Sequence, residues 1–150
     1  MQQTLMNKLH EYIRENNPDL LFQLKEDKKV TEYLSDKIST VSVLIKQMDI
    51  GQPTYIIEDV CMDVMTQDLR PSKFNYISNL LQEEFESTYE QILESGTLKF
   101  EVINLINQCQ SVFEDLNFSD ENEDNQFLRY AILGTISEYL EGITSGNENV

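Results

Sequence analysis

The chain has 150 residues, of which 40% are hydrophobic, and its 11 basic and 27 acidic residues give a formal charge of −16 at neutral pH. This length and apolar content predict one globular domain with a substantial core and argue against a disordered chain. The charge argues against nonspecific binding to nucleic acid or anionic lipid, because their phosphates repel an acidic protein.

Apolar residues recur at helical spacing from the start of the chain. A first helix begins near Leu5 and stops before Pro18, because proline restricts the residue that precedes it. Asn17 and Pro18 suit the N-cap and first position of a short second helix. A third and longer apolar stripe covers residues 30–48.

The middle of the chain continues this pattern. Pro53 opens a fourth helix, which ends before Pro71. Ser72 is a suitable N-cap for a long stripe over residues 76–93. The Ser-Gly pair that ends at Gly96 is a helix stop, since glycine tolerates the left-handed conformation of a C-cap.

A further stripe covers residues 102–116, and an acidic loop of residues 119–125 follows it. Either Asp124 or Asn125 would cap the last helix, whose stripe covers residues 128–140.

These stripes predict an all-α protein, a single compact domain of six or seven helices joined by short loops. We expect this domain to cover residues 1–143 and the polar residues 144–150 to form a frayed tail. The sequence shows no internal repeat and no linker, so it predicts no domain boundary.

Cellular location is also constrained. No apolar stretch approaches the ~20 residues of a membrane-spanning helix. Residues 1–6 lack a basic region followed by an apolar run, so no secretory signal is expected. The two cysteines are too few for a disulfide framework. We therefore expect a cytoplasmic protein with no membrane partner.

Several segments, taken together, resemble a bacterial family of small all-α domains of unknown function, often encoded in conjugative and other mobile elements. The segments are LHEYI (9–13), NPDL (17–20), LRPSKFNYI (69–77), EEFE (83–86), SGTL (95–98), EVIN (101–104), VF (112–113), ENED (121–124), LGTI (133–136) and YLE (139–141). The resemblance spans residues 5–141. It implies an all-helical fold and an accessory role in a mobile element, and it carries over no catalytic residues.

The acidic loop has a partial calcium-binding pattern. Asp120, Asn122 and Asp124 match the first, third and fifth positions of an EF-hand loop. Asn125 and Ala131, however, stand where that loop needs glycine and a bidentate glutamate. We therefore expect a solvated loop rather than a calcium site.

Other catalytic patterns fail in similar ways. The pair His10-Glu11 resembles the start of a zinc-protease helix, but Arg14 stands where the second histidine would be. Cys61 and Cys109 lie on apolar helix faces without nearby cations, which predicts buried, inert thiols. The glycines form no phosphate-binding motif. We predict no catalytic residue, no metal ligand and no cofactor.

Charge is distributed unevenly. From residue 76 to residue 150 the only basic residues are Lys99 and Arg129, against 15 acidic ones, a balance of −13 (2 − 15). This asymmetry suggests an acidic binding face. The carboxylates that we single out for partner binding are Glu83, Glu84, Glu86, Asp120, Glu121, Glu123 and Asp124.

A basic turn precedes this acidic half and adds Arg70, Ser72 and Lys73 to the candidate partner-binding residues. A helix N-terminus there would favour an anion or an acidic partner. The alternative, which we favour, is that the two cations pair with carboxylates of the protein itself.

Three aromatic residues leave a second question open. Tyr55, Tyr89 and Phe118 would suit either a protein interface or the core, and their spacing does not decide between the two.

Our leading hypothesis is a non-enzymatic accessory or adaptor protein, acting through its acidic surface on a protein with a basic surface, without direct contact to nucleic acid. One alternative is a DNA mimic that inhibits a DNA-binding protein. Others are an enzyme with an unrecognised carboxylate or metal site, and a structural oligomer.

Overall fold

The computed structural model describes the backbone of residues 1–148 and the side chains of residues 1–142. It is 81% helical, and no strand occurs in the described part, which confirms the all-α class. The number of helices differs from the prediction, because residues 1–148 form nine α-helices rather than six or seven.

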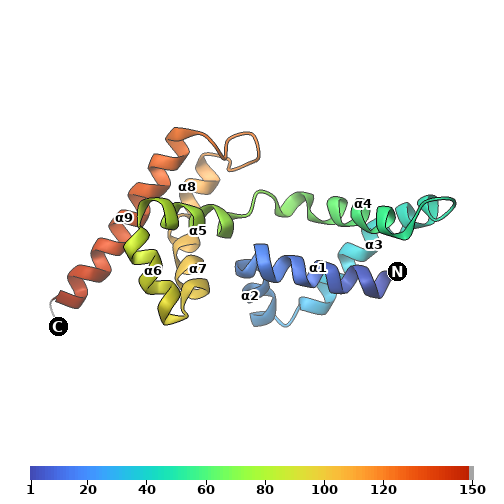
Figure 1. Cartoon of the computed structure of the whole chain (residues 1–150), viewed down its shortest axis with the longest axis horizontal. Helices are drawn as coiled ribbons and strands as arrows, with labels where there is room; N and C mark the ends of the chain where they lie inside the picture. The colour runs from blue at the N-terminus through green and yellow to red at the C-terminus, as the bar shows by residue number, and fades with distance from the viewer. Residues whose placement is uncertain (149–150) are drawn as a thin grey trace. The chain divides into compact units, whose positions relative to one another are not determined.

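The chain divides into two compact units, unit 1 (Met1–Arg70) and unit 2 (Pro71–Val150). Unit 1 contains α1 (Gln2–Asn16), α2 (Pro18–Glu26), α3 (Val30–Met48), α4 (Thr54–Thr66) and the 3-10 turn η1 (Gln67–Leu69). Unit 2 contains α5 (Lys73–Glu84), α6 (Glu86–Ser95), α7 (Leu98–Gln108), α8 (Gln110–Asp115) and α9 (Gln126–Glu148) (Figure 1).

The additional helices come from two breaks inside predicted helices. Phe85, with φ −132° and ψ 50°, separates α5 from α6. Cys109, with φ −93° and ψ 2°, separates α7 from α8. Neither break contains glycine or proline, so the sequence has no local signal for it. Both residues pack on the core of unit 2, and we attribute the breaks to that packing.

Several predicted helix ends are confirmed. The Ser72 hydroxyl accepts a hydrogen bond from the Asn75 amide at 3.0 Å, as an N-cap does. The Asn125 side chain accepts one from the Leu128 amide at 3.1 Å. Gly96 ends α6 in the left-handed conformation, with φ 76°. Asn17 is an exception, because its side chain does not cap α2 and donates instead to the Leu69 carbonyl at 3.3 Å.

Each unit has its own hydrophobic core. The core of unit 1 consists of Leu5, Leu9, Ile13, Leu21, Leu34, Ile38, Val41, Ile57, Cys61 and Met65. The core of unit 2 consists of Ile77, Leu80, Leu81, Val102, Leu105, Ile106, Cys109, Phe113, Leu128, Ile132 and Ile136. The two clusters share no residue.

The two units repeat one plan, which corrects the expectation of no internal repeat. Adding 68 to the residue numbers of α1, α2 and α3 gives the positions of α5, of α6 and of α7 together with α8. Asn17 and Phe85 make nearly the same backbone break (φ −136°, ψ 54° and φ −132°, ψ 50°), and Lys28 and Gly96 both have positive φ. Buried residues coincide in the pairs Leu9/Ile77, Ile13/Leu81, Leu34/Val102, Ile38/Ile106 and Val41/Cys109.

The fourth helix of each unit follows the same plan with a shift of 71 positions. Its buried residues pair as Ile57/Leu128, Cys61/Ile132 and Met65/Ile136. An ion pair ties this helix to the first helix of its unit in both cases, but the signs are exchanged. In unit 1 Lys8 of α1 contacts Glu58 of α4 at 2.6 Å. In unit 2 Arg129, which stands at the position of Glu58, contacts Glu83 and Glu84 of α5.

This repeat is nearly invisible in the sequence because it conserves burial rather than residue identity. Between residues 5–48 and their counterparts, identical residues occur only at Asn7, Glu15, Gln23, Glu26 and Ile38. Core positions accept many apolar residues of similar volume, so a fold can persist while identity is lost.

The C-terminal prediction is only partly addressed. Helix α9 runs to Glu148, and residues 149 and 150 lie outside the described residues. Fraying of residues 144–150 and a single domain over residues 1–143 therefore stay predictions.

Candidate functional site

The negative charge of the protein is concentrated in unit 2. Unit 2 contains 15 acidic residues and only three basic ones, Lys73, Lys99 and Arg129, a balance of −12 (3 − 15). Unit 1 has 12 acidic and 8 basic residues, a balance of −4 (8 − 12). The candidate site is therefore the carboxylate surface of unit 2.

Arg129 neutralises part of this surface. Its guanidinium donates hydrogen bonds to Glu84 at 2.8 Å and to Glu83 at 3.1 Å, which join α9 to α5. The bonds to these two carboxylates raise the pKa of Arg129. Two of the predicted partner-binding residues thus have a partner within the protein. The sequence gives no local sign of it, because Arg129 lies 45 residues from Glu84.

Glu86 behaves differently from its neighbours. It is the first residue of α6, it is exposed, and no ion pair to it occurs among the described residues. A carboxylate in the first turn also interacts favourably with the helix dipole. Of the three carboxylates predicted around the α5–α6 junction, Glu86 is the one most available to a partner.

Hydrogen bonds of the Asn122 side chain order the acidic loop. The side-chain amide of Asn122 donates to the carbonyls of Leu116 and Asn117, at 2.7 and 3.0 Å, and its side-chain oxygen accepts from the Ser119 amide at 2.8 Å. The third position of the failed EF-hand pattern therefore has a structural role. The predicted carboxylates Asp120, Glu121 and Asp124 are exposed, and Glu123 is half-buried.

The basic turn is occupied by internal contacts. Arg70 donates to the Asp63 carboxylate at 2.9 Å and to two backbone carbonyls near the end of α4. The ammonium group of Lys73 lies 5.4 Å from the centre of the Phe113 ring. The internal carboxylate pairing that the sequence favours is therefore found for Arg70, whereas Lys73 forms no ion pair among the described residues.

The three ambiguous aromatic residues fall into two classes. Phe118 packs against Phe113 and Tyr76, with ring centres 4.8 and 5.1 Å away, and Tyr89 is partly buried against the same core. Tyr55, in contrast, is 66% exposed. Burial of Tyr76 raises the pKa of its hydroxyl, mainly by desolvation.

Both cysteines are buried, as predicted. Desolvation raises the pKa of the Cys109 thiol to about 12 and also raises the pKa of Cys61. A reactive thiol needs a lowered pKa, so neither environment suits a nucleophile.

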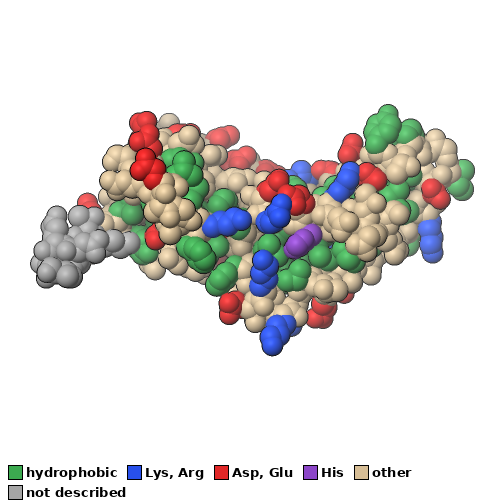
Figure 2. Space-filling model, turned by 60° about the horizontal axis from the view of Figure 1, so that its bottom comes forward, with side chains coloured by type: hydrophobic (Ala, Val, Ile, Leu, Met, Phe, Trp, Pro, Cys, Tyr) green, Lys and Arg blue, Asp and Glu red, His purple; other side chains and the backbone are tan. Residues whose placement is uncertain are grey.

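Carboxylates do not gather in a metal-binding arrangement within the described residues, since no group of three or more His, Cys, Asp or Glu side chains is suited to an ion there. On the face that Figure 2 shows, acidic side chains lie in several separate places, some of them next to basic side chains. This distribution suits contact with a surface more than chemistry at one point.

A groove of about 610 Å³ lies between α1 and α3 in unit 1. All its lining residues are uncharged: Gln2, Gln3, Met6, Ser35, Ile38, Ser39 and Ser42. The hydroxyls of Ser39 and Ser42 donate to backbone carbonyls of their own helix at 3.0 Å. The groove therefore offers no titratable group for acid–base chemistry.

Comparison with known proteins identifies a family of unknown function. Over residues 1–148, no helix combines the length and the hydrophobicity needed to cross a bilayer. No curated protein and no solved structure matches the chain. Residues 5–143, which extend over both units, match the domain of unknown function DUF1896, and the chain belongs to that family.

Proposed function

We propose that this protein is a non-enzymatic adaptor of a bacterial mobile element and acts in the cytoplasm. Its acidic unit 2 binds a protein with a basic surface. The observation that carries the proposal is the net charge of −12 on unit 2, whose three basic residues leave most of its carboxylates unneutralised. The negative electrostatic field of unit 2 attracts a partner with a basic surface and repels acidic proteins.

The contacts of Arg129 refine which carboxylates are involved. Glu83 and Glu84 form the ion pairs with Arg129 that join α5 to α9. We therefore infer that they stabilise the fold and are not the residues that bind the partner. Glu86, Asp120, Glu121 and Asp124 are exposed and provide the field that a partner meets. Their separation over α6 and the acidic loop favours docking over catalysis.

The test begins with affinity capture of the tagged chain from its native host and identification of the partner. Association of the purified pair is then followed by stopped flow from about 0.01 to about 1 M salt. We expect the association rate to fall at least about tenfold over this range, because salt screens the steering field.

Two matched variants locate the effect. One neutralises Glu86, Asp120, Glu121 and Asp124 as Gln or Asn, and should slow association. The control neutralises four exposed carboxylates of unit 1, and should leave the rate nearly unchanged: Glu26, Glu32, Asp36 and Asp49. The proposed function would be ruled out if the association rate changed neither with salt concentration nor with either set of neutralised carboxylates.

A further inference from the structure

Helix α6 is the least embedded helix of unit 2 among those whose side chains are described. It has no fully buried residue, whereas its counterpart in unit 1, α2, buries Pro18 and Leu21. Tyr89, on one side of α6, packs against the core of unit 2. The opposite side is open to contact by another molecule.

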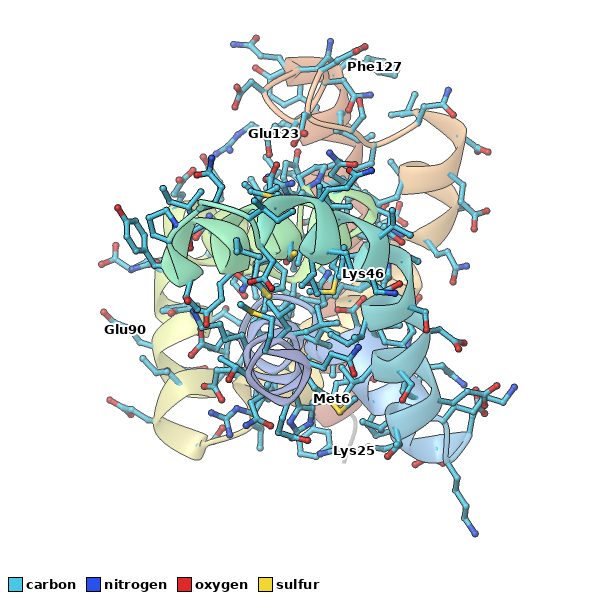
Figure 3. All side chains as sticks on the ribbon, turned by 90° about the vertical axis from the view of Figure 1, so that its right-hand side faces the viewer. Met6, Lys25, Lys46, Glu90, Glu123 and Phe127 are labelled. Carbon is cyan, nitrogen blue, oxygen red and sulfur yellow. The ribbon has the colours of Figure 1, made fainter. Side chains whose placement is uncertain are left out.

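That outer side carries a row of carboxylates. Glu86, Glu90 and Glu94 are spaced four residues apart, which places them on one face of the helix, and all three are exposed. Glu90 projects away from α6 in Figure 3. Within the described residues no lysine or arginine pairs with any of them.

Glu90 and Glu94 do not stabilise the helix itself. Like charges four residues apart repel one another, and Glu94 lies in the last turn, where the helix dipole is unfavourable for an anion. A solvated helix face normally mixes both signs of charge. The arrangement lowers the stability of α6 and concentrates negative charge along one line.

Two exposed apolar side chains lie on α6 and on the helix that follows it. Leu93 on α6 is 53% exposed, and Phe100 on α7, beyond the Gly96 turn, is 63% exposed. The equivalent positions in unit 1 hold Lys25 and Glu32, which are charged. Unit 2 therefore replaces two solvated charges of the common plan with apolar groups, as a protein interface would need.

We propose that the outer face of α6, together with Phe100, is a docking surface for a basic amphipathic helix of another protein. Lysine or arginine side chains spaced four residues apart meet Glu86, Glu90 and Glu94, and an apolar side chain of the same helix packs on Leu93 and Phe100. Symmetric pairing with the α6 face of a second copy does not fit, because the two carboxylate rows would repel each other. This inference rests on the proposed function and locates its binding surface.

The probe is a synthetic amphipathic helical peptide with lysines every four residues and leucines beside them. A scrambled peptide of the same composition is the matched control. The full-length protein, labelled with nitrogen-15, is titrated with each. We expect the amphipathic peptide to shift amide resonances mainly within residues 86–100, and the scrambled one to bind at least about tenfold more weakly.

Two double variants distinguish binding at α6 from a general effect of the charge of unit 2. Glu90→Gln with Glu94→Gln removes two charges from α6, and Asp120→Asn with Glu121→Gln removes two from the acidic loop. The α6 pair should weaken peptide binding several-fold more than the loop pair. Leu93→Ser with Phe100→Ser should weaken it at least about tenfold, while Val43→Ser, an exposed position of α3, should have no effect.

Equal binding of the scrambled peptide, resonance shifts spread over all of unit 2, or equal effects of the two charge pairs would each overturn the docking surface. If the captured partner then still associated in a salt-dependent way, the proposed function would stand without this surface. If the association were independent of salt, both would fall.

Discussion

Lys28 holds a backbone conformation that costs most residues free energy. It follows α2 with φ 59°, and its amide and that of Lys29 donate to the carbonyls of Lys25 and Leu24, at 3.2 and 2.9 Å. Gly96 closes α6 with the same pair of bonds. The chain thus contains a lysine and a glycine in equivalent turns, and only the glycine avoids the steric cost.

We therefore predict that Lys28→Gly raises the free energy of unfolding by about 0.5–1 kcal/mol. The substitution removes the steric cost of the left-handed conformation, and the greater conformational entropy of glycine in the unfolded chain offsets part of this gain. Gly96→Ala should lower it by about 1 kcal/mol. Urea denaturation measures both. Lys28→Ala is the matched control, since it removes the charge but keeps the Cβ atom. Equal stabilisation by Ala and Gly would show that charge, not backbone, is responsible.

Cys109 gives a second prediction at this scale. Its pKa is about 12 in the folded protein, against 9.0 for an ordinary thiol, because burial disfavours the thiolate. Above pH 9 the unfolded chain loses this proton while the folded chain keeps it. Stability from this residue is therefore complete below pH 9 and is lost as the pH rises toward 12.

The measurement is the free energy of unfolding against pH in wild type and Cys109→Ala. The substitution lowers stability throughout, but it should flatten the decline between pH 9 and pH 12. Tyr33, whose pKa burial raises to about 12, adds to the remaining slope. Parallel curves for the two proteins would contradict the assignment.

At the scale of the element, helix starts depend on single side chains. Ser72 and Asn125 accept the amide hydrogen bonds that begin α5 and α9. We predict that Ser72→Ala and Asn125→Ala each lower the free energy of unfolding by about 1 kcal/mol. Aspartate caps equally well, so Ser72→Asp and Asn125→Asp should retain most of the stability in urea denaturation. An aspartate variant as unstable as the alanine one would argue against capping.

At the scale of the whole molecule, the two separate cores make a specific prediction. Ile13 and Leu81 occupy equivalent buried positions in units 1 and 2. Ile13→Ala should cost about 2–5 kcal/mol and increase amide hydrogen exchange mainly within residues 1–70. Leu81→Ala should increase amide hydrogen exchange mainly within residues 71–148. Mass spectrometry of hydrogen exchange measures both effects.

A milder pair, Ile13→Val and Leu81→Val, keeps the experiment interpretable if the alanine variants unfold. Loss of protection throughout residues 1–148 from either substitution would mean that the two units unfold as one cooperative block.

The sequence by itself determined the all-α class, most helix boundaries, the two buried cysteines and the caps at Ser72 and Asn125. These features depend on local chemistry: the 3.6-residue period, proline and glycine geometry, and side chains that reach nearby amides. It also located the excess of carboxylates, since composition needs no fold.

Only the tertiary structure decided the breaks at Phe85 and Cys109, the ion pairs of Arg129 and the repeat of the two units. Each depends on residues far apart in the chain that meet through packing, and many apolar residues satisfy the same buried position. The exposed face of α6 belongs to this class as well. Its apolar and acidic residues follow an ordinary helical pattern, and only the packing of the other helices shows which side stays uncovered.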